Sequence, residues 1–399
     1  MQTIFVTGMG IVSALGAGIE ANRLALREQR SGLGTAQFIQ SRLTPLLPVG
    51  EVPFSNESLS RLAGVTAGTQ NRLVLLGLLA MREALGDGFA ATQVSTGFIN
   101  ATSVGGMADV ENIYTELINP DKPIANSAIG DSLDCAQGTE ILARHFGIQQ
   151  QIATVSTACS SSANAIGYGM RLLQAGVVDR VICGGSDTLT RFTLNGFNSL
   201  RNTDTALCLP FDENRNGLNL GEGAAYLVLE TAKSLAATKR LPLGILSGYA
   251  NYNEAFHPTA PSPDGKGAYE AMQGALRKAA LSPEEISYVN AHGTATLNND
   301  IAEAKAMLRL FPNGLPPFSS TKSYTGHTLA AAGAIEAVFS LLSILHSELY
   351  PTLRFNTPMI EAPIKAFLDV QEGVKVNHVL SSSFGFGGNN ASLILSRYA

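Results

Sequence analysis

The sequence predicts an α/β fold with largely buried sheets. Short apolar runs typical of strands alternate with longer stretches in which apolar residues recur at helical spacing. Of the 399 residues, 45% are hydrophobic and 15% are charged, so the chain can bury a large core. Forty glycines and no tryptophan indicate tight turns and close backbone packing rather than disorder.

The predicted elements follow one another in two series. In the first, strands are expected over 3–6, 97–101, 153–157, 180–183 and 225–229, with helices over 72–85, 163–174 and 232–238. The pattern then restarts, with strands over 244–249, 286–290, 379–382 and 392–396 and helices over 267–280, 300–310 and 329–345. The segments TVSTACSSSANAIG and STKSYTGHTLAAAGAIEAV echo each other, since each runs polar residues into a reactive residue and then an Ala/Gly-rich helix. Two related halves would bring both helix starts to the centre; ordinary helix composition is the alternative explanation.

Charge and hydropathy exclude several classes of partner. The net charge is −5 and no basic run occurs, so nucleic acid is not an expected partner. The N-terminal segment lacks a positive region followed by a cleavable apolar stretch. The longest apolar run, 330–345, is about one turn short of a membrane span and contains Glu336. We therefore expect a cytoplasmic protein that does not cross a membrane.

Four cysteines are present: Cys135, Cys159, Cys183 and Cys208. They form no CxxC pair and no His/Cys cluster with zinc spacing, so neither a disulfide nor a metal site is expected. They are then buried small apolar side chains, or one of them is a reactive thiol.

Cys159 lies where a strand passes into a helix whose first residues are small. The partial positive charge and free N–H groups of a helix N-terminus favour a thiolate there. Small neighbours leave room for a substrate carbonyl, whose oxygen could meet the N–H of Cys159. By position alone, an inert buried cysteine is the more common explanation, because free cysteines are usually buried.

Two histidines strengthen the catalytic interpretation. His292 in NAHGTAT directly follows a predicted strand, and His327 in KSYTGHTLAAAG precedes a small-residue helix. A cysteine and two histidines in such settings form a candidate catalytic constellation. Of the other histidines, only His257 lies in a loop, AFHPTAPSPDG, that is expected to border a site.

Five motifs occur in a characteristic order: VSTACSSSA, PFDENRNGLNLGEGAA, NAHGTATLNND, KSYTGH with AAAGAIEA, and SSFGFGG. With them the chain resembles the β-ketoacyl-acyl carrier protein synthases, the elongating ketosynthases of thiolase-like fold, over nearly its whole length. The resemblance implies a five-layer αβαβα fold of two related halves. Residues 1–240 would carry the cysteine, and residues 241–399 both histidines.

The resemblance also implies roles for individual residues. Cys159 would accept the acyl chain as a thioester, while His292 and His327 would bind the malonyl thioester carbonyl and promote loss of CO2. Two imidazole N–H groups aimed at one oxygen would stabilise the resulting enolate. Around them, the resemblance implies supporting roles for Lys322, Glu336, Asp300 and Glu303; a solvated helix face is the alternative for these charges.

Further positions are assigned to the substrate in the same way. The N–H of Phe386 would join that of Cys159 as the oxyanion hole, and Thr294 and Thr296 would bind the pantetheine arm. The resemblance places the remaining substrate contacts at Phe384, Val104, Phe197 and His257. Plain core packing is the alternative for Phe386, and ordinary turn roles are the alternative for the threonines.

Three observations separate this chain from other users of the fold. A thiolase would need a second cysteine in the C-terminal loop, which reads SSSFGFGG. An initiating synthase would carry asparagine where His327 stands, and a chain-length factor would lack Cys159. We therefore expect an elongating, decarboxylating acyltransferase; a non-condensing partner subunit is the alternative.

Some features depart from the commoner family pattern. NRNGLNLGEGAA replaces the usual RDG-F form, Asn164 stands where many members have histidine, and the stretch from Gly105 to Cys135 is compact. These departures fit a polyene or polyketide branch at least as well as primary fatty acid synthesis.

The expected partners are acyl carrier protein and a second subunit, in a homodimer or a heterodimer with a chain-length-factor-like chain, joined through strand 153–157. No metal or organic cofactor is expected, because the pantetheine belongs to the carrier.

Overall fold

One mixed sheet runs through the molecule. The computed structural model describes residues 2–119 and 131–398, and its eleven-stranded sheet has the order β4-β3-β5-β6-β1-β7-β13-β12-β8-β9, with β2 paired to β1. The strands are β1 (Phe5–Ser13), β2 (Gly16–Ala17), β3 (Thr96–Ala101), β4 (Gln150–Val155), β5 (Arg180–Asp187), β6 (Gly223–Glu230), β7 (Gly244–Asn253), β8 (Tyr288–Asn290), β9 (Phe318–Ser319), β12 (His378–Gly385) and β13 (Asn389–Ser396). A separate pair joins β10 (Glu348–Leu349) to β11 (Gln371–Glu372).

The strand order repeats. The path β4-β3-β5-β6-β1 and the path β9-β8-β12-β13-β7 each place the third, second, fourth, fifth and first strand of a half side by side. The directions repeat as well, because the first three strands of each path are parallel and the other neighbours antiparallel. The two paths meet where Phe5 and Val6 pair with Ile245 and Gly244. This repeat bears out the expected construction from two related halves, while the proposed boundary near residue 240 stays a prediction.

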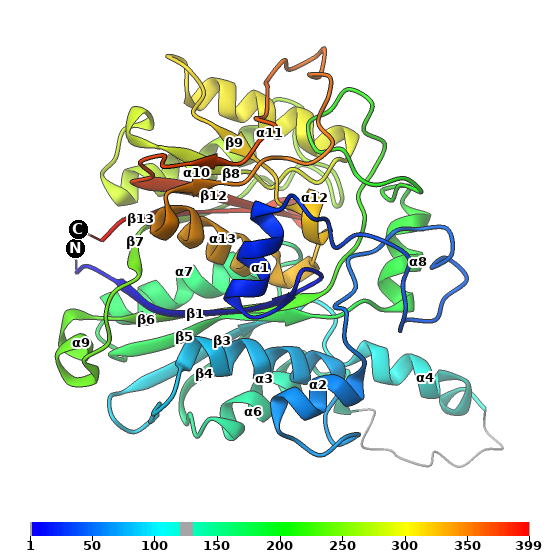
Figure 1. The fold of residues 1–399 in the computed structure, drawn as a ribbon, viewed down its shortest axis with the longest axis vertical. Helices are drawn as coiled ribbons and strands as arrows, with labels where there is room; N and C mark the ends of the chain where they lie inside the picture. The colour runs from blue at the N-terminus through cyan, green and yellow to red at the C-terminus, as the bar shows by residue number, and fades with distance from the viewer. Residues whose placement is uncertain (1, 120–130, 399) are drawn as a thin grey trace.

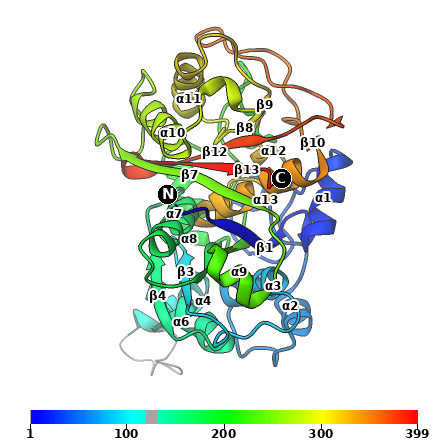
Figure 2. The same cartoon turned by 90° about the vertical axis from the view of Figure 1, so that its left-hand side faces the viewer.

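Helices complete the five layers (Figure 1). Between the two half-sheets lie α7 (Ser161–Gln174) and α13 (Ala332–His346), which contact each other. The outer face of the first half-sheet is covered by α3 (Arg72–Leu85) and α6 (Cys135–His145), and that of the second by α10 (Lys266–Ala279) and α11 (Leu297–Leu310), as the turned view in Figure 2 also shows. The other described α-helices are α1 (Ile19–Arg27), α2 (Asn56–Ala63), α4 (Met107–Leu117), α8 (Arg191–Ser199), α9 (Ala232–Thr238) and α12 (Lys322–Thr325).

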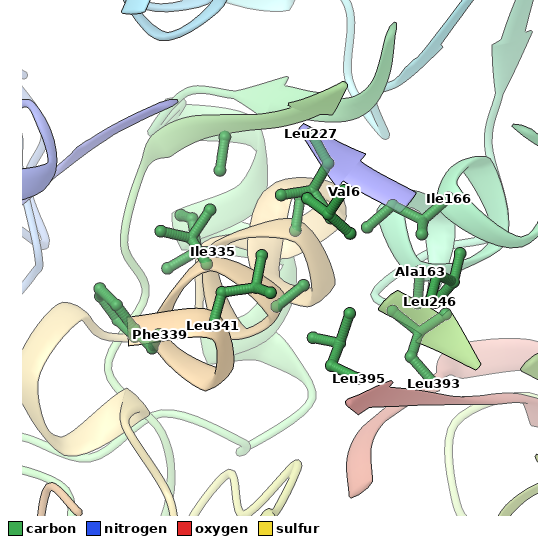
Figure 3. Packing of buried hydrophobic residues seen from close by; sticks show 14 of the residues in the cluster. Val6, Ala163, Ile166, Leu227, Leu246, Ile335, Phe339, Leu341, Leu393 and Leu395 are labelled. Carbon is green, nitrogen blue, oxygen red and sulfur yellow. The ribbon is translucent and has the colours of Figure 1, made fainter. Parts of the chain in front are cut away.

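The main core surrounds the central helices. Ile335 of α13, Val6 and Leu227 of the first half, and Leu393 and Leu395 of the second all belong to one buried cluster (Figure 3). Burying one such side chain stabilises the fold by roughly 1.5–3 kcal/mol. The central layer therefore ties the two half-sheets together, and it fixes the helix N-termini that carry the site.

The apolar run around Glu336 has a structural explanation. The helical segment Leu329–His346 has 18 residues, two more than the apolar run 330–345, and is long and apolar enough to cross a membrane. However, 89% of it is buried inside the protein. Among the described residues it is the only such segment, and its composition matches a helix packed between two sheets.

Candidate active site

A cavity of about 320 Å³ brings the predicted catalytic residues together. Cys159, His292 and His327 all line it, although they are far apart in sequence and come from both halves. Each lies near the end of a sheet strand or the start of a helix: Cys159 before α7, His292 after β8 and His327 before α13. The predicted convergence of these three side chains is therefore present.

The segment around Cys159 is a tight elbow. Ala158 has a φ of 52°, which turns the chain sharply between β4 and α7. The hydroxyl of Ser161 accepts the N–H of Thr157 at 2.8 Å and donates to the carbonyl of Ala158 at 2.5 Å. Ser162 reaches the second central helix, since its hydroxyl accepts the N–H of Ala334 at 2.9 Å. The small residues thus allow the two helix starts to meet as well as leaving room for substrate.

Close packing confirms this second role. A Cβ added at Gly333 of α13 would lie 2.9 Å from both the N and the Cβ of Ala163 of α7. Real Cβ atoms almost never approach so closely. Bulky residues at either helix start would push the cysteine away from the histidines.

Burial favours the protonated form of the Cys159 thiol. Cys159 is 5% exposed, and burial raises its pKa to about 12. The charge of Lys322 and the N–H groups of Phe386 and Cys159 oppose this shift without reversing it. The N–H groups at the helix start therefore favour the thiolate as expected, but desolvation outweighs them. Both N–H groups lie close to the sulfur, so they are within reach of the carbonyl oxygen of an acyl group bound to it.

Phe386 lies in the three-residue turn between β12 and β13. Its neighbour Gly387 has a φ of 81°. The ring of Phe386 stacks on that of Phe197, with centroids 5.4 Å apart. Phe197, Phe384 and Phe386 all line the cavity. The interpretation of Phe386 as plain core is wrong, since it borders the cavity and is only partly buried.

The rings of His292 and His327 are arranged edge to face. Their centroids are 5.4 Å apart and both residues are 2% exposed. The Nζ of Lys322 lies 3.2 Å from Nδ1 of His292 and donates to the carbonyl of His292 at 2.6 Å. An ammonium only donates, so Nδ1 accepts and the ring proton sits on Nε2.

Burial keeps both imidazoles neutral. It lowers the pKa of His292 and of His327 well below the usual value, and the nearby charge of Lys322 adds to the effect. Lys322 is itself paired with the buried Glu336 of α13. Burial raises the pKa of Glu336 to about 7, against the attraction of Lys322. The interpretation of these charges as a solvated helix face is wrong for both residues.

Asp300 and Glu303 hold the loop after β8. Both are fully buried, on α11. Glu303 accepts the N–H groups of His292 and Gly293 at 2.8 Å each, and Asp300 accepts that of Thr294 at 3.0 Å. Burial raises the pKa of Glu303 to about 8 despite these bonds. The pair therefore positions His292 through its backbone.

His327 is held by the first half of the chain. Its N–H donates to the carbonyl of Asn219 at 2.8 Å, and its carbonyl accepts the N–H of Gly221 at 2.9 Å. The Asn219 side chain accepts the N–H of Cys208 and donates to the carbonyl of Ala206. Asn219 was not singled out from the sequence; its place within NRNGLNLGEGAA was the available signal.

Two other supporting residues, Asp187 and Asn164, were not predicted to belong to the site. Asp187, at the end of β5, accepts the hydroxyl of Thr102 at 2.6 Å and the N–H of Ala330 at 2.9 Å, so it joins the strand ends to the start of α13. Asn164 was noted only as a departure, yet it is the centre of a polar network beside Cys159.

The predicted substrate positions divide into two groups. Thr294 and Thr296 line the cavity, and their hydroxyl oxygens are 2.8 Å apart. Val104 and His257 do not line it. His257 is exposed, and its Nδ1 accepts the N–H of Thr259, whose residue does border the cavity. The loop therefore borders the cavity through Thr259, Ala260 and Pro261, whereas His257 itself does not line it.

Comparison with known proteins agrees with this geometry. The family model of the β-ketoacyl synthase N-terminal domain matches residues 1–234, and that of the C-terminal domain matches residues 243–356. The 3-oxoacyl-[acyl-carrier-protein] synthase 2 of Rhizobium meliloti (strain 1021) is 33% identical over 420 residues, which cover 100% of this chain and 99% of the relative. The protein of the same name from Staphylococcus aureus (strain COL) is 30% identical over 409 residues, covering 100% and 99%.

Solved structures are similar over the full length. The ketosynthase ApeO of Xenorhabdus doucetiae, in complex with its chain length factor ApeC, is 31% identical with a TM-score of 0.86, covering 100% of this chain and 98% of that chain. The ishigamide ketosynthase/chain length factor is 27% identical with a TM-score of 0.91, covering 100% of both. With its cysteine, two histidines and repeated half-sheets in place, the chain belongs to the β-ketoacyl synthase family, acyltransferases that lengthen an acyl thioester by condensation.

Proposed function

We propose that this protein condenses an acyl group held on Cys159 with malonyl-acyl carrier protein, extending the chain by two carbons with loss of CO2. The observation that carries the proposal is the shared cavity of Cys159, His292 and His327. Two backbone N–H groups act on the sulfur, and two neutral imidazoles face each other in the same cavity. A non-condensing subunit would have no use for this arrangement.

The first half-reaction is acyl transfer. The sulfur of Cys159 attacks the thioester carbonyl of the acyl carrier, and the developing oxyanion lies at the N–H groups of Cys159 and Phe386. The carbon–sulfur bond to the carrier breaks, and the carrier thiol leaves with the proton that Cys159 gives up. Losing one such N–H donor raises a barrier by about 3 kcal/mol.

The second half-reaction forms the new carbon–carbon bond. The bond between the malonyl α-carbon and its carboxylate breaks, CO2 leaves, and the electron pair forms an enolate. The N–H on Nε2 of His292 and an N–H of His327 stabilise the enolate oxygen. The α-carbon then attacks the Cys159 thioester, and the sulfur departs from the tetrahedral intermediate as a thiolate, which takes a proton from solvent to restore the thiol.

The decisive experiment is mass spectrometry of the protein after incubation with acyl carrier proteins that carry different acyl chains. We expect an acyl adduct on Cys159 and, once malonyl-acyl carrier protein and the partner subunit proposed below are added, a product two carbons longer. Cys159→Ala should give neither, whereas Cys135→Ala, a matched control away from the cavity lining, should give both. No adduct with any chain would contradict the proposal.

We also propose a heterodimer with a chain-length-factor-like subunit, in a pathway that makes a polyene or polyketide. The similar structures named above, a ketosynthase with its chain length factor, support this assembly. So does strand β4, which lies at the edge of the sheet with Ile152 40% exposed, beside α7. An exposed edge is a template for pairing with a second chain.

Light scattering and a condensation assay together test this assembly. We expect light scattering to show a complex of the two chains when this chain is co-expressed with a nucleophile-lacking homologue from the same genome. We expect the chain alone to be inactive in condensation, and the complex to be active. A stable homodimer that condenses by itself would contradict the heterodimer and leave the condensation intact. We further propose that the protein works in the cytoplasm and needs no cofactor beyond the pantetheine of the carrier.

A further inference from the structure

Asn164 is the centre of a hydrogen-bond network between the nucleophile elbow and two other strands. It lies in the first turn of α7 and is 8% exposed. Its Nδ2 donates to Oγ1 of Thr157 and to Oδ1 of Asn389, at 2.8 Å each. Its Oδ1 accepts the hydroxyl of Tyr249 at 2.8 Å and Nδ2 of Asn251 at 3.0 Å. Both ends of the amide are therefore satisfied, which fixes its orientation.

Asn389 connects this network to the Phe386 turn. Its Oδ1 accepts three hydrogen bonds: from Oγ of Ser160 at 2.8 Å, from Asn164 at 2.8 Å and from Asn251 at 2.7 Å. Asn389 is the first residue of β13 and pairs with Gly385, the last residue of β12. The three residues between them carry the N–H of Phe386.

The turn is seated directly on the nucleophile elbow. A Cβ at Gly385 would lie 2.8 Å from the carbonyl oxygen of Thr157 and 3.2 Å from the N of Cys159. On its far side, the N–H of Gly387 donates to the carbonyl of Pro258 at 2.7 Å. The distance between the two oxyanion donors thus depends on how the base of the turn is anchored.

We propose that Asn164 is a positioning residue, which acts through Asn389 to set where the N–H of Phe386 lies relative to that of Cys159. This inference rests on the proposed function. Oxyanion donors must lie within about 3.1 Å of the developing charge, and a misplacement of about 1 Å costs roughly 100-fold in rate. Because an amide is neutral, its removal changes the geometry of the donors without adding a charge beside the thiol.

Two reactions of the same sulfur separate this role from a structural one. Acylation of Cys159 by hexanoyl-N-acetylcysteamine forms an oxyanion, whereas alkylation by iodoacetamide does not. The free thioester also removes any dependence on carrier docking. Both rates are measured on the Cys159 peptide by mass spectrometry in wild type, Asn164→Ala, Asn389→Ala, the double variant and Asn389→Asp.

We expect acylation to fall by roughly 100-fold in each alanine variant, with alkylation changed less than about threefold. The acylation rate of the double variant should fall no further than that of either single variant, because both substitutions remove the same hydrogen bond between Asn164 and Asn389. Asn389→Asp keeps the acceptor oxygen but adds a carboxyl group, so it should recover part of the ratio of acylation to alkylation that Asn389→Ala loses. A parallel fall of both rates, or no fall in acylation, would overturn the inference. Absence of acylation in the wild type would overturn the proposed function and the inference with it.

Discussion

The Nζ of Lys322 lies 3.2 Å from Nδ1 of His292, and this contact determines how the histidine works. The ammonium occupies one ring nitrogen, so the other nitrogen carries the proton and is free to donate to substrate. The same charge, together with burial, keeps the pKa of His292 low. His292 is therefore a hydrogen-bond donor rather than a cation.

Lys322→Met should destabilise the protein by about 3–5 kcal/mol, because it leaves the Glu336 carboxyl buried without its partner. The double variant Lys322→Met/Glu336→Leu should recover most of this loss, since no buried charge remains. Urea denaturation measures both. A double variant as unstable as Lys322→Met would mean that the lost stability does not come from the isolated carboxyl.

His327→Ala should reduce malonyl decarboxylation by at least about 100-fold, because one of two donors to the enolate is lost. Acyl transfer to Cys159 should change far less, since the oxyanion hole of that step is made of backbone. Release of labelled CO2 and formation of the Cys159 adduct report the two steps. Equal loss of both would contradict the division of labour between cysteine and histidines.

Alkylation of Cys159 by iodoacetamide should rise about tenfold for each pH unit between pH 7 and pH 10. The reason is that burial raises the pKa of the thiol to about 12, so the thiolate fraction grows throughout this range. The label is located by peptide mass spectrometry, with Cys159→Ser as control. A plateau below pH 8 would show that the thiolate is already stable at neutral pH.

Glu303→Gln should alter how stability depends on pH. Burial raises the pKa of Glu303 to about 8 from 4.5, so between these values the folded state holds a proton that the unfolded state has lost. The wild type must therefore lose stability as pH rises through this window, by at most about 1.4 kcal/mol per unit. Glutamine does not titrate, and the variant should lose less. Parallel stability curves from pH 5 to pH 8 would contradict the raised pKa.

Strands and long buried helices were predictable because their apolar periodicity is strong. The helices 72–85 and 232–238 agree residue for residue with α3 and α9. The first predicted strand, by contrast, ended at residue 6, whereas β1 continues to Ser13. The glycines of β1 interrupt the apolar pattern by which a strand is predicted. A Cβ at Gly10 would lie 2.1 Å from the carbonyl oxygen of Ala80 in α3, so close packing against that helix, rather than strand propensity, requires glycine there.

The site was predictable where chemistry leaves a sequence signature, and not where only tertiary contact does. Cys159 and the two histidines stand in recognisable loops, and the sequence correctly placed them in one site. Asn219 positions His327 by its backbone carbonyl, which any residue type possesses. The raised pKa of the Cys159 thiol could not be predicted, because a helix start is visible in sequence whereas the depth of burial is not.

The near-complete burial of His292 and His327 also bears on what happens after CO2 departs. The enolate carbon is a strong base, and any water molecule beside it would quench it to an acetyl thioester before a carbon–carbon bond could form. Because both histidines are only 2% exposed, they shield the enolate from solvent, which raises the yield of elongated product per malonyl consumed. Mutations that admit solvent there should uncouple decarboxylation from condensation. Malonyl groups would then be consumed at a high rate without forming elongated product.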